Sequence, residues 1–297
     1  MSAPVGPQRW FARCAAALVG YLLFVIVFGA WVRITGSGAG CGEHWPSCQG
    51  VLVPRTPSQA TLIEYSHRLT SGLLGIASLL LPIAALRIFP RGHGARRWSA
   101  AALFFVAVEA AIGALLVKRG LVADNASLAR AVVVALHLVN TLLLTASAAL
   151  TVASASPVPE PARPILDWRS AGVLVGLGIV AASGAVTALG DTLFPVGSPQ
   201  SLSDHFLVQL RVVHPILASA LVLGAIAWAR WMAGVTAARP WATAVGALAL
   251  LQLAVGGLNI VLRAPGALQL THLLIAQLLW ISAVLAARSY AHASARN

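Results

Sequence analysis

The chain has 297 residues, of which 59% are hydrophobic and only 9% are charged. A typical soluble domain carries roughly 25% charged residues, so this composition excludes a soluble globular protein. The high hydrophobicity also excludes a disordered chain. The formal net charge of +12 comes without the basic stripes and interleaved aromatics of a nucleic-acid-binding surface, so we expect no nucleic-acid partner. The composition predicts a protein embedded in the lipid bilayer.

Eight segments are long and apolar enough to span a bilayer as helices, which takes about 20 residues each. In chain order they are 11–32, 62–88, 97–117, 128–152, 169–189, 207–232, 241–262 and 267–288. The first segment is longer than the apolar core of a signal peptide, so we expect it to be a retained helix. The predicted fold class is an all-α membrane protein with eight transmembrane helices.

The cationic side chains are distributed unequally between the two sides of these helices. Of the 20 Lys and Arg residues, 12 fall on the side of the N-terminus, and the other 8 are Arg33, Arg55, Arg68, Lys118, Arg119, Arg130, Arg211 and Arg263. Cytoplasmic loops carry an excess of Lys and Arg. We therefore expect both termini to be cytoplasmic.

A stretch rich in Pro and Ala, residues 153–166, divides the chain near its midpoint. Polar residues of the first half recur in the second half, at the pairs His67 and His214, His137 and His272, and Glu109 and Gln252. The pattern predicts two pseudo-symmetric four-helix bundles, residues 1–156 and 157–297, and internal repeats of this kind often frame a site in membrane proteins. The sequence leaves two alternatives for Glu109, which are a hydrogen bond to His137 and a hydrogen bond to a helix neighbour.

Four of the eight histidines lie inside apolar segments, and they are His67, His137, His214 and His272. Each is roughly 5–10 residues from the outer end of its helix, so the four share one layer of the membrane. Ionisable residues inside the membrane are rare and usually functional. One such histidine is often a packed core residue, but four at one depth in two pairs indicate metal ligands.

Imidazole binds several metals, and two assignments compete. A zinc site would need about four ligands converging on one ion. Two pairs of histidines, each pair within one bundle, fit two haems with axial imidazoles better, and the apolar surroundings suit a porphyrin. Cations at the outer edge could bind the propionates or serve only as interfacial anchors, and they are Arg68, Lys118, Arg119, Arg130, Arg211 and Arg263.

The residue three positions before each first histidine differs between the halves. Glu64 precedes His67, whereas Arg211 precedes His214. A carboxylate near a haem edge could accept a proton or stabilise developing charge, and an arginine could hold a propionate. The asymmetry predicts a reactive site in the N-terminal half and a retained cofactor in the C-terminal half. The alternative for Glu64 is an ion pair with Arg68, four residues on, without chemistry.

The first outer loop contains Cys41 and Cys48, with six residues between them. A disulfide is the natural state of such a pair outside the cytoplasm. A metal site with His44 would lack further ligands, and a redox-active disulfide is a third alternative. Cys14 is expected to be an unpaired core residue.

Three motifs in this region carry a resemblance to the heme A synthase family of bacteria and mitochondria. They are Arg-x-Thr-x-Ser-Gly at Arg33–Gly38, Cys-x-x-x-Trp-Pro-x-Cys-x-Gly at Cys41–Gly50, and Ile-Glu-x-x-His-Arg at Ile63–Arg68. The three later helix histidines and the eight helices extend the resemblance over nearly the whole chain.

The resemblance implies oxidation of the C8 methyl group of heme O to the formyl group of heme A. His67 and His137 would flank the substrate haem, with Glu64 as the essential carboxylate. His214 and His272 would ligate the iron of a haem b cofactor. The residues expected to support haem binding are Arg211, Arg68, Lys118, Arg119 and Arg263.

Cys41 and Cys48 match the outer-loop cysteine pair of the family. A second pair found in some members has no counterpart in residues 190–206. Members often have Gln where Glu109 stands.

The resemblance also implies a multi-pass protein of the bacterial cell membrane, with its active-site layer near the outer face. Heme O synthase and cytochrome oxidase assembly factors are the expected protein partners, and a homo-oligomer is open. The alternative function is a non-catalytic haem carrier or a cytochrome b-like electron conduit. That alternative predicts two equivalent pockets and no need for Glu64.

Overall fold

The computed structural model describes residues 6–155, 166–199 and 204–295. Its long helices are α1 (Gly6–Ile34), α2 (Gln59–Ile88), α3 (Gly94–Lys118), α4 (Leu128–Ala153), α5 (Trp168–Leu193), α7 (Val213–Met232), α8 (Arg239–Val261) and α9 (Gly266–Ser294), with short helices η1 (Ser37–Ala39), α6 (Phe206–Gln209) and η3 (Leu210–Val212) between them. Within these ranges there is no β-strand, and Cys48 and Val51 form one isolated bridge. The expectation of an all-helical chain is confirmed.

Eight helical segments are long and apolar enough to cross a membrane. The sixth combines α6, η3 and α7 into one span, Phe206–Met232. Each of the eight overlaps one segment expected from the sequence, and most extend a few residues further at one or both ends. Hydropathy finds these segments because a spanning helix needs about 20 apolar residues.

Polar side chains set the first residue of several helices. Ser58 accepts a hydrogen bond from the backbone N–H of Thr61 at the start of α2, and Ser127 caps α4 in the same way. Asp167 accepts from the first backbone N–H groups of α5. These caps satisfy donors that have no partner within the helix.

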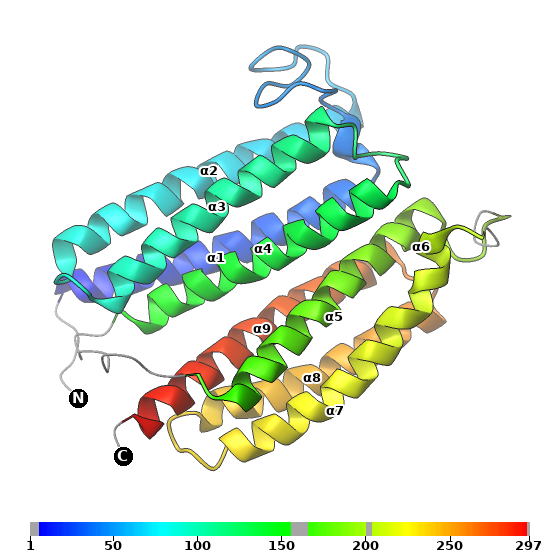
Figure 1. The fold of residues 1–297 in the computed structure, drawn as a ribbon. Helices are drawn as coiled ribbons and strands as arrows, with labels where there is room; N and C mark the ends of the chain where they lie inside the picture. The colour runs from blue at the N-terminus through cyan, green and yellow to red at the C-terminus, as the bar shows by residue number, and fades with distance from the viewer. Residues whose placement is uncertain (1–5, 156–165, 200–203, 296–297) are drawn as a thin grey trace.

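The helices form two groups that lie side by side, α1–α4 in one and α5–α9 in the other (Figure 1). One apolar core is built from α1 to α4 and includes Phe11, Leu22 and Leu144. A second core packs α7, α8 and α9 around Met232 and Val245. The junction expected between the halves, residue 156 to 157, lies outside the described residues.

Buried contacts between α4 and α9 join the two groups. Trp280 donates from its indole Nε1 to the backbone oxygen of Leu142 at 2.7 Å. Thr145 Oγ1 and Gln277 Oε1 are 3.1 Å apart, and both side chains are buried. The halves therefore share an interface with specific polar contacts.

The outward faces of the helices are apolar. On α2, Leu73, Ile76 and Leu80 are 58%, 58% and 59% exposed and lie along one face. Such a continuous apolar surface is unfavourable in water and natural against lipid tails. The chain is a multi-pass membrane protein.

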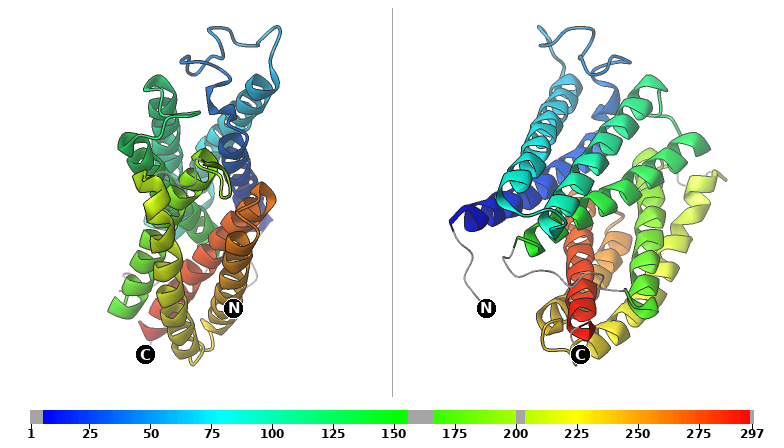
Figure 2. Two further views of the ribbon diagram at one scale, coloured as in Figure 1. Left: turned by 90° about the vertical axis from the view of Figure 1, so that its right-hand side faces the viewer. Right: turned by 60° about the vertical axis from the view of Figure 1, so that its left-hand side comes forward.

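The loop between α1 and α2 lies at the end of the molecule opposite to the start of α1 and the end of α9 (Figures 1 and 2). Both ends of the described chain therefore lie on the side away from this loop.

Candidate functional site

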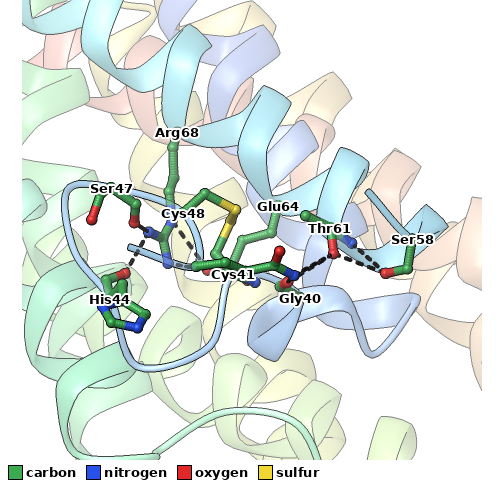
Figure 3. Close-up of a disulfide and its surroundings, with 10 residues drawn as sticks. Gly40, Cys41, His44, Ser47, Cys48, Ser58, Thr61, Glu64 and Arg68 are labelled. Carbon is green, nitrogen blue, oxygen red and sulfur yellow. Dashed lines mark hydrogen bonds and ion pairs between the residues drawn. A yellow bond between two sulfur atoms is a disulfide. The ribbon is translucent and has the colours of Figure 1, made fainter. Parts of the chain in front are cut away.

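The loop between α1 and α2 is closed by the disulfide Cys41–Cys48 and anchored to α2 by Glu64 (Figure 3). Glu64 is 4% exposed. Its Oε2 accepts a hydrogen bond from the backbone N–H of Cys41 at 2.8 Å, and its Oε1 lies 2.5 Å from Arg68 Nη2. The disulfide and the ion pair, each an alternative left open by the sequence, are both present.

Arg68 extends this anchor to the rest of the loop. Its Nη1 donates to the backbone oxygens of His44 and Ser47, each at 2.6 Å. The guanidinium thus binds a carboxylate and two carbonyl groups of the protein. Such a charge-assisted network holds both the loop and the side chain in place.

A close backbone approach completes the loop anchor. Thr61 Oγ1 donates to the backbone oxygen of Gly40 at 2.8 Å. A Cβ at position 40 would lie 2.4 Å from the backbone of Ala60. Only glycine allows the loop to lie this close to the start of α2.

The two histidines of the N-terminal half lie in different surroundings. The ring of His67 packs edge-on against Phe28, with centroids 5.5 Å apart. Its Nδ1 is buried without a hydrogen-bond partner among the described residues. His137 Nδ1 lies 3.5 Å from Glu109 Oε1, at ion-pair distance.

Glu109 on α3 is held by two side chains of α4. Thr141 Oγ1 donates to Glu109 Oε1 at 2.5 Å, and Asn140 donates from its amide nitrogen to Oε2. Asn140 also donates to the backbone oxygen of Phe105 at 3.0 Å. Of the two alternatives for Glu109, the hydrogen bonds to helix neighbours are therefore present, and His137 lies at ion-pair distance without a hydrogen bond to the carboxylate.

The two histidines of the C-terminal half face each other. The rings of His214 and His272 have centroids 6.3 Å apart and are nearly perpendicular, at 87°. His214 Nδ1 lies 3.1 Å from Ser183 Oγ, and His272 Nε2 lies 3.1 Å from Gln252 Nε2. Each ring is therefore oriented by a polar side chain of a neighbouring helix.

Three of the four histidines pack against a glycine of the helix before them. A Cβ at the glycine would lie 3.2 Å or less from the nearest ring atom, and the pairs are His67 with Gly29, His214 with Gly184, and His272 with Gly256. Small residues let helices approach closely in a membrane. Here they make room for the imidazole rings.

The expected propionate cations fall into two groups. Arg211 is engaged by the protein, because its Nε lies 2.8 Å from Asp191 Oδ1 and its Nη2 donates to the backbone oxygens of Gly190 and Phe194. Arg68, with Glu64, and Arg130, with the backbone oxygens of Ala123 and Asn125, are engaged by the protein as well. The side chains of the remaining three are exposed, and they are Lys118, Arg119 and Arg263.

Arg33 was not among the candidates, although it opens one of the quoted motifs. It lies in the last turn of α1 and reaches the other half, where its Nη1 donates to Ala188 O at 2.6 Å and to Thr192 Oγ1. Its Nη2 donates to Gln269 Oε1 at 3.0 Å. From the sequence, a cation at a helix end indicates only interfacial anchoring.

Residues 12–284 match the model of the COX15-CtaA family, described as a cytochrome oxidase assembly protein. The chain belongs to this family. The match includes at least part of each of the eight spans, so membership in the COX15-CtaA family extends to both halves of the molecule.

Individual relatives agree with this family. A protein named protoheme IX farnesyltransferase from Thermus thermophilus is 43% identical over 297 residues, which is 94% of this chain and 48% of that protein. Heme A synthases of Lysinibacillus sphaericus and Geobacillus kaustophilus are 40% and 39% identical over 112 residues, 38% of this chain and 36% and 34% of those proteins. The chain thus spans about half the length of the Thermus relative, and about a third of each synthase is matched.

Proposed function

We propose that this protein is a heme A synthase, which oxidises the C8 methyl group of heme O through an alcohol to the formyl group of heme A for terminal oxidases. The observation that carries the proposal is the presence of four intramembrane histidines, two of which lie side by side, in a chain of the COX15-CtaA family. The heme A synthases that match are about 40% identical. The Thermus relative has a different name, but more than half of that protein lies outside the match.

We assign a haem b cofactor to His214 and His272. At a metal–nitrogen distance of roughly 2 Å, a 6.3 Å separation of the two ring centroids leaves room for one iron between them. His272 Nδ1 is also buried without a partner among the described side chains. Gly184 and Gly256 have no Cβ atom, which at these positions would crowd the imidazole rings of His214 and His272. Imidazoles are common axial haem ligands, and the bound group would supply a one-electron redox centre.

We assign the substrate haem to His67 and His137. His67 Nδ1 is buried without a hydrogen-bond partner among the described residues, and His137 Nδ1 lies beside Glu109. The role proposed for the two histidines is to ligate the iron and orient the C8 methyl group toward the reacting side chains.

Glu64 is the proposed carboxylate of the reaction, holding a proton or stabilising positive charge that develops on the substrate. It is the buried acid nearest in the chain to His67, three residues away and on the same helical face. Because its oxygens also bind Arg68 and Cys41 N, its test must separate chemistry from anchoring of the loop.

The pairing of the halves supports two pseudo-symmetric bundles, residues 1–156 and 157–297. Glu109 lies beside His137, and Gln252, its counterpart in the sequence comparison, lies beside His272. In this arrangement both termini are cytoplasmic and the site is near the outer face of the bacterial cell membrane. Lys118, Arg119 and Arg263 are the exposed cations available to propionates, whereas Arg68 and Arg211 would have to exchange protein partners for them.

Heme O synthase is the proposed source of the substrate, and cytochrome oxidase assembly factors are the proposed partners for delivery of the product. The family description and the relative named protoheme IX farnesyltransferase support this setting. The oligomeric state stays open.

The deciding experiment is extraction and chromatography of haems from aerated cells that produce the protein together with a heme O source. We expect heme A from the wild type and none from His272→Ala. If the wild type yields only haem b and heme O, the protein is not a heme A synthase. In that case, two pockets that still bind haem would favour the carrier or electron-conduit function.

Glu64→Gln and Arg68→Gln form a matched pair for the carboxylate. Both remove the ion pair, but only the first removes the carboxylate. We expect Glu64→Gln to abolish heme A formation while Arg68→Gln retains a measurable part of it. Equal losses in both variants would assign Glu64 to loop anchoring alone.

A further inference from the structure

Glu109 is an acidic residue inside a membrane-spanning helix, and the proposed reaction does not use it. Placing a carboxylate in this environment is costly unless it is partnered or functional. Its partners are donors from α4: Thr141 Oγ1 at 2.5 Å from Oε1, and the amide nitrogen of Asn140 at Oε2. An ionised carboxylate accepts hydrogen bonds at both oxygens, and these contacts place a polar donor group beside each oxygen of Glu109.

The third neighbour of this carboxylate is His137. Its Nδ1 lies 3.5 Å from Glu109 Oε1 and has no hydrogen-bond partner among the described residues. Thr141 Oγ1 also lies 2.9 Å from the backbone oxygen of His137, so one hydroxyl group, with a single proton to donate, contacts both residues. The carboxylate is therefore held beside the Nδ1 atom, and the Nε2 atom on the other side of the ring is left for a ligand.

The C-terminal half has an uncharged amide at the equivalent place. Gln252 Nε2 lies 3.1 Å from Nε2 of His272, and the run that begins at Gln252 resembles the run that begins at Glu109. Both residues lie on the helix just before their histidine helix, α8 before α9 and α3 before α4. Each half thus sets a polar side chain beside its second histidine, an acid at Nδ1 of His137 and an amide at Nε2 of His272.

We propose that Glu109 is a positioning residue that orients His137 through Nδ1 and gives this histidine an anionic partner, which His272 lacks. This inference rests on the proposed function, because it takes His137 and His272 as haem ligands. An anionic partner makes an imidazole a stronger donor to its metal and stabilises the oxidised metal. The haem at His137 therefore has a lower midpoint potential than it would have with an amide partner, and the two pockets are electronically unequal.

A purely structural role makes a different prediction. If Glu109 only clamps α3 to α4 through Asn140 and Thr141, replacing it by Gln changes stability but leaves the potential of a bound haem where it was. The test must therefore measure the haem itself, and the second half of the molecule offers the reciprocal substitution.

The experiment is a redox titration of the purified full chain, reconstituted with haem b and followed by its absorption spectrum, in wild type, Glu109→Gln and Gln252→Glu. We expect Glu109→Gln to change the redox equilibrium constant of one haem about tenfold. For a one-electron couple this raises the midpoint potential by about 59 mV. Gln252→Glu should lower the other potential. Glu109→Asp, which keeps the charge, should stay near the wild-type value.

Unchanged potentials in both Glu109→Gln and Gln252→Glu, with haem still bound, would overturn the inference. If Glu109→Gln does not fold, Gln252→Glu decides alone, and an unchanged potential in that variant overturns the inference as well. Failure of the proposed function is seen separately. In that case the cells form no heme A, although the potentials of bound haem b still shift as expected.

Discussion

Replacing Arg68 by Gln should release the disulfide loop from α2. The substitution removes an ion pair with Glu64, whose side chain is 5% exposed against 12% for Arg68, and two hydrogen bonds of 2.6 Å to loop carbonyls. Removing one partner of a buried pair costs about 3–5 kcal/mol. Arg68 keeps some exposure, and Glu64 keeps its hydrogen bond to Cys41 N in the variant. We therefore take the loss in stability of the closed loop as about 3 kcal/mol, at the low end of that range.

The assay is the rate at which a soluble thiol reductant opens the disulfide. Both cysteines are fully buried, so reduction requires local opening of the loop, and its rate follows the population of the open state. At about 1.4 kcal/mol per factor of ten, a loss of about 3 kcal/mol raises that rate by roughly two orders of magnitude. Arg55→Gln, in an exposed part of the same loop, is the control and should leave the rate unchanged. A rate for Arg68→Gln within about threefold of the wild type would refute this account of the loop, because threefold is under 1 kcal/mol.

Two further substitutions test the packing of the helices. Gly184→Ala places a Cβ 2.9 Å from His214 Cε1, so the ring must move. We expect the haem absorption spectrum of this variant to change while its unfolding temperature stays close to that of the wild type. Gly178→Ala is the control, because a Cβ there meets open space, and it should change neither property. Identical spectra in the two variants would contradict this expectation. Trp280→Phe removes the bond from Nε1 to Leu142 O between the halves, and we expect a loss of about 0.5–1.5 kcal/mol for the hydrogen bond plus a packing loss, seen as a lower unfolding temperature in detergent.

The membrane helices could be predicted from the sequence because spanning is a local property. A run of about 20 apolar residues bounded by polar ones defines a span without reference to the rest of the chain. The four intramembrane histidines could be selected for the same reason, since their cost depends on depth along one helix. The i, i+4 ion pair of Glu64 with Arg68 is local as well, and the structure contains it.

The partners of these residues depend on which helices meet, and only the tertiary structure decided them. Glu64 also binds the backbone N–H of Cys41, 23 residues away, and Arg33 binds Gln269 across the two halves, 236 residues away. Arg211, expected from its position beside His214 to face a propionate, instead pairs with Asp191. Hydropathy and spacing carry no information about such contacts, because they arise from the rotation and packing of whole helices.

The low charge of the chain, 9% of its residues, is enough by itself to indicate a membrane protein. It does not indicate what the few charged residues do. In the structure the acids within the helices have definite partners: Glu64 holds a disulfide loop, Glu109 lies beside His137, and Asp191 pairs with Arg211. Charges inside a bilayer need such partners because they are far more costly alone, and the fold determines which partner each one finds.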